Sequence, residues 1–509
     1  MNMAKANLLD DYNPNPDNFY AGLIKGQKFA VIPRLELDSG EVLEQCPIAY
    51  KTWGVLNDTR DNVLVVCHAL TGSSDVSDWW APLLGRGRAF DPARFFIFCA
   101  NVLGSPYGSA SPLTIEPSTG SQYAGHFPQT TVRDDVRAHK LVLDALGVRS
   151  VAAVIGGSMG GMTTLEWPLC TAPGYVRNII PIATAADHSA WGISWAETQR
   201  QCIYSDPKFD DGYYEPTPEG QPSAGLAAAR MVAMLTYRSC VSFDARFGRR
   251  PPRQQQQKKP QPQSAAVEPP LDLPRTEVPV VSAAAAPQQK SDSGANTTVA
   301  NCHHGGGSTG GSGSASASGG KKPPHARRDP SFSAQGYLHY QGQKFVRRFD
   351  ANCYLHITNK MDAHDVTLGR ILPPHPAAAA ASSTSDDDDD EALRTVLSRA
   401  PPGALVVSVE TDALFLPEQQ ERLAACLPAA SLAVLRSSDG HDGFLLEFEQ
   451  LGALIEGKLR REFPRFYDGG GSSGGGGENV GLESTATAVD GGAAGAGESL
   501  TGEMEGDAW

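Results

Sequence analysis

A serine flanked by glycines is the strongest candidate for a reactive group in this sequence. Ser158 lies in the segment GGSMGG at 156–161, directly after the apolar run 151–155. An apolar run followed by G-x-S-x-G predicts a strand, a sharp turn and a helix, with the serine hydroxyl presented at the turn. Gly156 and Gly160 fit this geometry, because residues without a Cβ let the backbone double back and the helix approach the strand. The pattern therefore indicates a nucleophile, although an idle serine in a glycine-rich turn has the same pattern.

A serine nucleophile needs a base and an orienting acid, and both types of residue follow in the order Ser, Asp or Glu, His. Glu410 and Asp412 come directly after the apolar run 404–409, at the carboxyl end of a predicted strand. We assign Asp412 as the acid and keep Glu410 as the alternative. His441 follows the apolar run 432–435 on a predicted loop, and we assign it as the general base.

Acyl transfer also requires backbone N–H groups that stabilise the oxyanion of the tetrahedral intermediate. One such group follows the nucleophile in this type of turn, and the other comes from the loop after an early strand. The run 63–67 predicts that early strand. We therefore assign the N–H groups of Leu70 and Met159 to the oxyanion hole. His68, on the same loop, is interpreted as a residue that fixes the turn and not as a catalytic group.

Short apolar runs alternate with helical patterns through the part of the chain that carries these residues. Alternation of this kind predicts an α/β protein with a mostly parallel sheet. One helix is expected to begin near Thr131 and to end at Gly147. The other expected strands have similar lengths and are found at 95–99 and 178–182.

Several longer segments resemble homoserine O-acetyltransferases, particularly the fungal enzymes. The resemblance covers roughly residues 17–248, 332–372 and 400–466. Its most specific segments are CHALTGSSDVSDWW at 67–80, NVLGSPYGSASP at 101–112, VIGGSMGGMTTLEW at 154–167 and GHDGFLLE at 440–447.

The resemblance implies an α/β-hydrolase fold and transfer of an acetyl group from acetyl-CoA to the hydroxyl of L-homoserine. It implies a ping-pong route through an acetyl-serine intermediate, a role in methionine biosynthesis, and a homodimer. Acetyl-CoA acts as a substrate here, so no bound cofactor and no metal are expected. The nucleophile, acid and base of the family fall on Ser158, Asp412 and His441.

Two further residues are assigned through the resemblance, as the groups that bind the homoserine substrate. Arg230 matches the arginine that binds the substrate and Asp442 the aspartate. A free amino acid offers a carboxylate for a guanidinium and an ammonium for a carboxylate, so the pair is chemically suitable. Without the resemblance, a surface ion pair for Arg230 and a helix N-terminal charge for Asp442 are the simpler interpretations.

The catalytic set leaves related functions open. A serine O-acetyltransferase, a homoserine O-succinyltransferase and a serine hydrolase all share the first half-reaction, so the triad does not separate them. A non-catalytic scaffold is the remote alternative. The Ser158, Asp412 and His441 set argues against this last function.

Composition limits the classes of partner and the compartment. A formal charge of −14 over 509 residues argues against nucleic acid and anionic membranes, which favour basic surfaces. The nine cysteines are scattered without a C-x-x-C pattern and indicate reduced thiols. No apolar run approaches the length of a membrane span. Without a signal or transit peptide at the N-terminus, we expect a cytoplasmic enzyme.

Low-complexity segments divide the chain. Residues 249–330, 373–399 and 468–509 are rich in Pro, Gln, Ala, Ser, Gly or acidic residues, and we expect them to be disordered. The hydrolase core is expected at 17–186 and 400–467, with a helical lid inserted at 187–248 and 331–372. Cys302, His303 and His304 are adjacent on a low-complexity segment and form a poor metal site. Likewise, GGGSTG at 305–310 matches a nucleotide-binding pattern but has no predicted strand before it.

Overall fold

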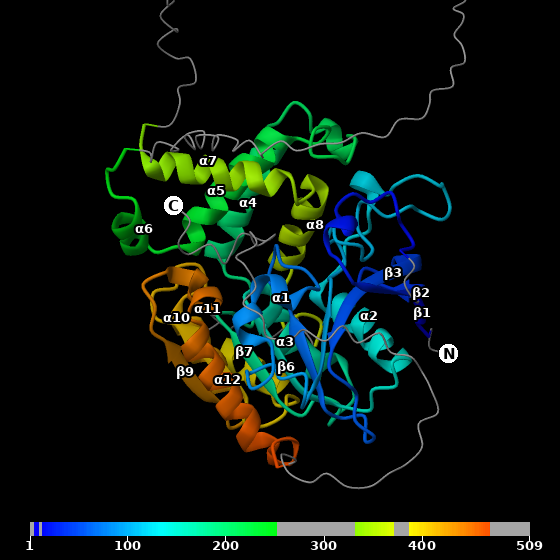
Figure 1. Ribbon diagram of the computed structural model, residues 1–509, viewed down its shortest axis with the longest axis vertical. Coiled ribbons are helices and arrows are strands. Elements are labelled where there is room, and N and C mark those ends of the chain that lie inside the picture. Colours follow the sequence, from blue (N-terminus) through cyan, green and yellow to red (C-terminus); the bar gives the residue numbers. More distant parts are fainter. Residues whose placement is uncertain (1–4, 10–12, 252–330, 371–385, 469–509) are drawn as a thin grey trace, which may run out of the picture. The chain divides into compact units, whose positions relative to one another are not determined.

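The computed structural model describes residues 5–9, 13–251, 331–370 and 386–468. Within these residues, one sheet has the strand order β1-β2-β3-β5-β4-β6-β7-β8-β9 (Figure 1). Strands β4 to β9 are parallel, whereas β1, β2 and β3 add to the edge beside β5 in antiparallel fashion. The prediction of a mostly parallel α/β sheet is confirmed. The strands are β1 (Asn7–Leu9), β2 (Lys28–Glu36), β3 (Val42–Trp53), β4 (Val63–Cys67), β5 (Phe96–Ala100), β6 (Val151–Gly157), β7 (Ile179–Ile182), β8 (Leu405–Val409) and β9 (Ser431–Leu435).

The three antiparallel strands were not predicted from the sequence. Both β2 and β3 contain a proline, Pro33 and Pro47, which argues against a strand when the sequence is considered alone. Their exposed and buried residues are also mixed, unlike the continuous apolar runs of the parallel strands. At the opposite edge, the apolar run 432–435 forms β9, the last strand of the sheet among the described residues, and its Leu432 and Val434 are exposed.

Helices cover both faces of the sheet and form two apolar layers. Along β4, Val63 and Val65 contribute to one layer while Leu64 and Val66 contribute to the other, as the two-residue period of a strand requires. Helices α2 and α3 pack in the first layer, and α12 packs in the second. The helices of the core are α1 (Val76–Trp79), α2 (Val132–Ala145), α3 (Met159–Cys170), α9 (Asp386–Leu397), α10 (Pro417–Cys426), α11 (Gly443–Leu446) and α12 (Phe448–Glu462).

Helices α4 to α8 form the lid, which lies over the carboxyl ends of the parallel strands (Figure 1). A buried ion pair anchors the lid to the core. Lys360 Nζ in α8 lies 2.8 Å from Asp135 Oδ2 in α2, and it also donates a hydrogen bond to the Leu103 carbonyl. The lid helices are α4 (Ala190–Tyr204), α5 (Ser223–Tyr237), α6 (Cys240–Arg246), α7 (Ser333–Val346) and α8 (Ala351–Asp362).

One predicted boundary is wrong. Residues 373–399 were expected to be disordered, but 386–397 form helix α9. Leu393, Val396 and Leu397 share one face of this helix and are buried against the core. The acidic run that suggested disorder forms the N-terminal end of the helix, where negative charge is favourable. Most of the predicted insertion at 249–330 and of the tail at 468–509 lies outside the described residues.

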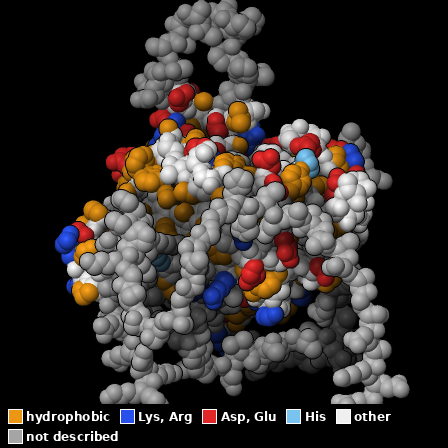
Figure 2. Space-filling view, turned by 90° about the horizontal axis from the view of Figure 1, so that it is seen from above, with side chains coloured by type: hydrophobic (Ala, Val, Ile, Leu, Met, Phe, Trp, Pro, Cys, Tyr) orange, Lys and Arg blue, Asp and Glu red, His pale blue; other side chains and the backbone are white. Residues whose placement is uncertain are grey.

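Several large apolar side chains of the lid are exposed. Figure 2 looks down on this face and shows hydrophobic side chains gathered on it. The exposed side chains include Trp191, Tyr204, Leu235 and Val241.

No helix of the described residues is long and apolar enough to cross a membrane.

Candidate active site

Ser158 stands at a strained turn between β6 and α3. Its φ of 58° and ψ of −126° place a non-glycine residue in a costly backbone region, and such strain is concentrated at functional sites. Two hydrogen bonds hold the turn. The Ser158 N–H donates to the Ile182 carbonyl at 3.0 Å, and Thr184 Oγ1 donates to the Ser158 carbonyl at 2.8 Å.

The glycines beside Ser158 are required by close backbone approach. A Cβ on Gly156 would lie 2.3 Å from the Gly160 carbonyl oxygen, and a Cβ on Gly160 would lie 2.2 Å from the Cys67 carbonyl oxygen. Both clashes involve backbone atoms, which cannot move aside as a flexible side chain can. The turn therefore tolerates only glycine at these two positions.

Gly160→Ala is expected to lower the free energy of unfolding by about 1–3 kcal/mol, the usual cost of overpacking a closely packed site. It should also reduce activity, since any relief of the clash moves Ser158 relative to β4. Urea denaturation provides the measurement. Gly336→Ala in α7 is the matched control, because a Cβ there meets nothing within 4 Å and alanine favours a helix by about 0.5–1 kcal/mol. Equal effects of the two substitutions would contradict this account.

Asp412 and His441 form a buried hydrogen-bonded pair. His441 Nδ1 lies 2.7 Å from Asp412 Oδ2, and both side chains are almost completely inaccessible. Asp412 Oδ1 accepts the backbone N–H groups of Leu414 and Phe415, each at 2.9 Å, so the carboxylate has a single orientation. Glu410 is exposed. The structure thus brings Asp412, and not Glu410, into contact with the histidine.

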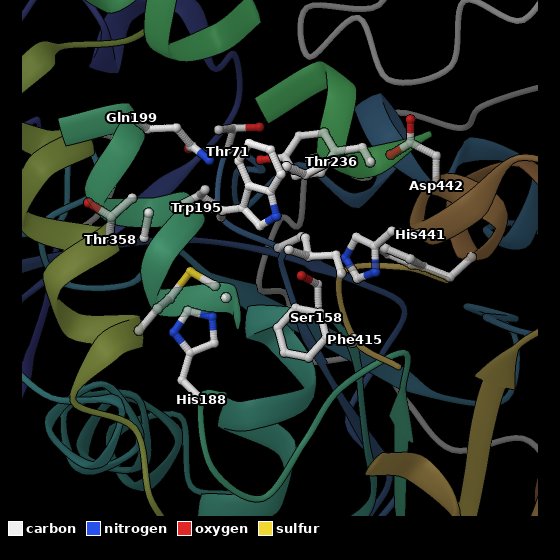
Figure 3. A pocket seen from close by; sticks show the side chains of 18 of the residues that line it. Thr71, Ser158, His188, Trp195, Gln199, Thr236, Thr358, Phe415, His441 and Asp442 are labelled. Carbon is white, nitrogen blue, oxygen red and sulfur yellow. The ribbon is translucent and has the colours of Figure 1, made fainter. Parts of the chain in front are cut away.

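Ser158 and His441 line one cavity beneath the lid. Figure 3 shows the Ser158 hydroxyl beside the His441 ring. The ring of Phe415 stacks on that of His441 with centroids 5.2 Å apart, which fixes the imidazole plane. Because the Asp412 carboxylate accepts at Nδ1, the imidazole carries its proton there and its Nε2 can take a proton from the serine.

The two N–H groups assigned to the oxyanion hole lie on the expected elements. Met159 is the first residue of α3, where backbone N–H groups have no acceptor within the helix. Leu70 follows β4 and lines the cavity. His68 is buried outside the cavity lining, with Nδ1 2.8 Å from the Ala69 carbonyl oxygen. Burial lowers its pKa to about 4, which keeps the ring neutral in its structural position.

Of the two residues assigned to substrate binding, Asp442 is among the residues that line the cavity and Arg230 is not. The Asp442 Oδ2 atom lies 2.7 Å from Nε of Arg238, a lid residue between α5 and α6 that no sequence pattern indicated. Arg230 is buried in α5, with its guanidinium carbon 5.6 Å from the ring centre of Tyr237. Tyr237 in turn lines the cavity.

A second histidine of the cavity was also missed. His188 Nδ1 lies 3.1 Å from Asp362 Oδ1, and Arg200 donates to the other oxygen of that carboxylate at 2.6 Å. His188 follows a parallel strand, β7, as His441 follows β9, so the same argument from position could have identified it. Its partner Asp362 belongs to the second half of the lid, and no local pattern connects the two residues.

Among the described residues, no group of three or more histidine, cysteine or acidic side chains is arranged to bind a metal ion. Cys302, His303 and His304 lie outside the described residues. The cavity brings together a serine, an imidazole with a carboxylate behind it, and the loop that carries the Leu70 N–H.

Comparisons with known proteins agree with this chemistry. A family model described as the alpha/beta hydrolase fold matches residues 62–273. Homoserine O-acetyltransferase of Saccharomyces cerevisiae is 50% identical over 92% of this chain and 93% of its own length. Homoserine O-acetyltransferase of Cryptococcus neoformans var. grubii is 48% identical over 89% and 92%.

Solved structures support the same fold. Homoserine O-acetyltransferase from Bacillus anthracis matches with a TM-score of 0.60 at 20% identity, over 86% of this chain and 97% of that chain. Esterase E22 matches with a TM-score of 0.61 at 20% identity, over 85% and 99%. The fungal relatives show more than the fold, because their identity extends over nearly the whole chain. The protein therefore belongs to the homoserine O-acetyltransferase family of enzymes.

Proposed function

We propose that this enzyme transfers an acetyl group from acetyl-CoA to the hydroxyl of L-homoserine, in two steps through an acetyl ester of Ser158. The observation that carries the proposal is that Ser158 and His441 line one cavity, with Asp412 hydrogen-bonded behind the histidine. The names of the fungal relatives supply the acetyl group and the acceptor.

In the first step, Ser158 Oγ attacks the thioester carbonyl while His441 Nε2 takes the hydroxyl proton. The carbonyl oxygen becomes negative and is stabilised by the N–H groups of Leu70 and Met159. Collapse of this intermediate breaks the carbon–sulfur bond. The leaving CoA sulfur takes the proton from His441, and the acetyl group stays on Ser158.

In the second step, the homoserine hydroxyl attacks the acetyl ester and His441 takes its proton. The second tetrahedral intermediate collapses with release of O-acetylhomoserine, and the proton returns to Ser158. Water competes with homoserine at this stage. The lid covers the serine and so favours transfer over hydrolysis, because it limits access of water to the ester.

A thiol-release assay tests the reaction. Purified enzyme is mixed with acetyl-CoA or succinyl-CoA, each with homoserine, with serine or with no acceptor. We expect sustained CoA release only with acetyl-CoA and homoserine. Sustained release without an acceptor would indicate a hydrolase, and faster release with serine or succinyl-CoA would indicate one of the related transferases.

The acceptor is expected to bind between two charged residues, with its carboxylate on Arg230 and its ammonium on Asp442. Asp442 already contacts Arg238. We infer that this ion pair holds the carboxylate beside His441, where the substrate ammonium adds a second cation to it.

Arg230→Ala should slow the second step by about 10- to 100-fold, the effect of losing a charge-assisted hydrogen bond. Acetyl-serine should still form at a rate near that of the wild type, since the thioester donor makes no contact with this residue in the proposal. Rapid-quench mass spectrometry measures the two steps separately. Arg347→Ala, an exposed arginine of the same lid, is the control. An equal loss in both steps would show that Arg230 serves the fold or CoA.

The pathway and the cofactor requirement follow from the same proposal. O-acetylhomoserine formation places the enzyme in methionine biosynthesis, and the two substrates suffice without a bound cofactor. A cytoplasmic enzyme is expected from the composition. The exposed apolar side chains of the lid favour a homodimer formed through this face.

A further inference from the structure

The loop that carries the Leu70 N–H is fixed on its core side by a tight turn. The Ala69 carbonyl accepts the Gly72 N–H at 3.0 Å and lies 2.8 Å from Nδ1 of His68. The Ala69 carbonyl and the Leu70 N–H belong to one planar peptide unit, so holding the carbonyl also orients the N–H. This half of the loop is thus held by residues of the loop itself.

The other half of the loop is held from the lid. Arg348 lies on the short connection between α7 and α8, and its Nη1 donates to the Thr71 carbonyl at 3.1 Å. The same atom lies 3.2 Å from the hydroxyl oxygen of Tyr107. The guanidinium packs on the ring of Phe345, with its carbon 4.9 Å from the ring centre. Arg348 is 4% exposed, so these contacts are shielded from water.

The geometry points to Arg348 as a positioning residue of the oxyanion hole, acting through the Thr71 carbonyl on the Leu70 N–H. The inference rests on the proposed function, because it concerns the oxyanion formed from the thioester. Thr71 and Leu70 are the two central residues of the turn closed by Gly72. Holding the Thr71 carbonyl therefore restricts rotation of the turn, and the lid completes the oxyanion hole as well as covering the serine.

The hydrogen bonding of Arg348 argues against a purely structural role. Within the described part of the chain, its Nη2 atom is buried and makes no hydrogen bond. A buried donor without an acceptor destabilises the fold, and an apolar side chain at this position would avoid that cost. The guanidinium is thus placed at a cost in stability, as is typical of functional sites, where stability is exchanged for activity.

The test is the burst of CoA release from acetyl-CoA in the absence of homoserine, measured for Arg348→Met, Arg348→Lys and Arg347→Met. We expect Arg348→Met to lower the rate constant of the burst by about 10²-fold, the effect of a small displacement of catalytic groups. The burst amplitude should stay near that of the wild type. Transfer to homoserine should slow by a similar factor, because both steps use the same oxyanion hole. Lysine should restore part of the rate, and Arg347→Met, on the exposed neighbour, should match the wild type.

Amplitude and rate constant separate positioning from folding. A variant that only destabilises the protein lowers the amount of active enzyme, and hence the amplitude, while the remaining molecules react at the wild-type rate. That result, or an unchanged burst in Arg348→Met, would overturn the inference. If Arg348→Met does not fold, Arg348→Gln, whose shorter side chain gives up the contact with the Thr71 carbonyl, is measured in the same way, and a wild-type burst rate constant in that variant would overturn the inference. Failure of the wild type to form acetyl-Ser158 would instead refute the proposed function.

Discussion

Ser158→Ala is expected to abolish acetyl transfer, with a loss on the order of 10⁶-fold in turnover, as found when a triad nucleophile is removed. The same variant should form no covalent acetyl adduct. In the proposed mechanism the Ser158 hydroxyl oxygen attacks the thioester, and alanine removes this atom while leaving the cavity otherwise intact. Mass spectrometry of the wild type mixed with acetyl-CoA alone should find the added acetyl group on the peptide that contains Ser158.

Two controls make this result specific to the nucleophile. Ser194→Ala removes an exposed serine hydroxyl of α4 and should leave turnover unchanged. Thermal stabilisation of Ser158→Ala by CoA would show that the donor still binds. An acetyl adduct on another residue, or full activity in Ser158→Ala, would refute the assignment of the nucleophile.

Ser158 could be identified in the sequence as the candidate nucleophile because its signal is local. The strand, the glycines and the serine are adjacent in the chain, and each follows from one physical requirement of the turn. The parallel strands were predictable for a related reason, since strands buried on both faces form continuous apolar runs. Gly160, for example, was identified by spacing alone, and the structure shows that a side chain there would strike the Cys67 carbonyl.

Features that depend on distant contacts were not predictable. Arg238 pairs with Asp442 across about two hundred residues, and Asp362 holds His188 from the second half of the lid. No periodicity links such partners. Helix α9 was missed because the acidic run at its start outweighed the three apolar residues that dock on the core. Local composition indicates how a segment behaves alone, but burial depends on the surface that the rest of the chain provides.

The choice between the two neighbouring carboxylates also depends on contacts that the sequence does not show. Glu410 and Asp412 both follow β8, and spacing could not separate them with certainty. The structure separates them because the chain turns after β8, with the Asp412 N–H donating to the Val409 carbonyl at 3.1 Å. This turn directs Asp412 toward His441 and leaves Glu410 exposed.

Asp412→Asn should therefore reduce turnover by on the order of 10⁴-fold, the magnitude seen when a triad histidine loses the carboxylate that sets its tautomer. Glu410→Gln makes the same chemical change two residues away and should have little effect. The fold should survive in both variants. An asparagine Oδ1 can still accept the N–H groups of Leu414 and Phe415, so the thermal midpoint should change little.

Asp412→Ala distinguishes the two roles of this carboxylate. It removes the partner of His441 and also leaves two backbone N–H groups without their acceptor, so it should lose stability as well as activity. Turnover, measured with thermal melting for all three variants, tests the assignment. A large loss in Glu410→Gln with a small one in Asp412→Asn would mean that the acid was assigned to the wrong residue. Equal turnover in Asp412→Asn and Asp412→Ala, with lower stability only in the alanine variant, would show that orientation of His441 and support of the loop are separate functions of one side chain.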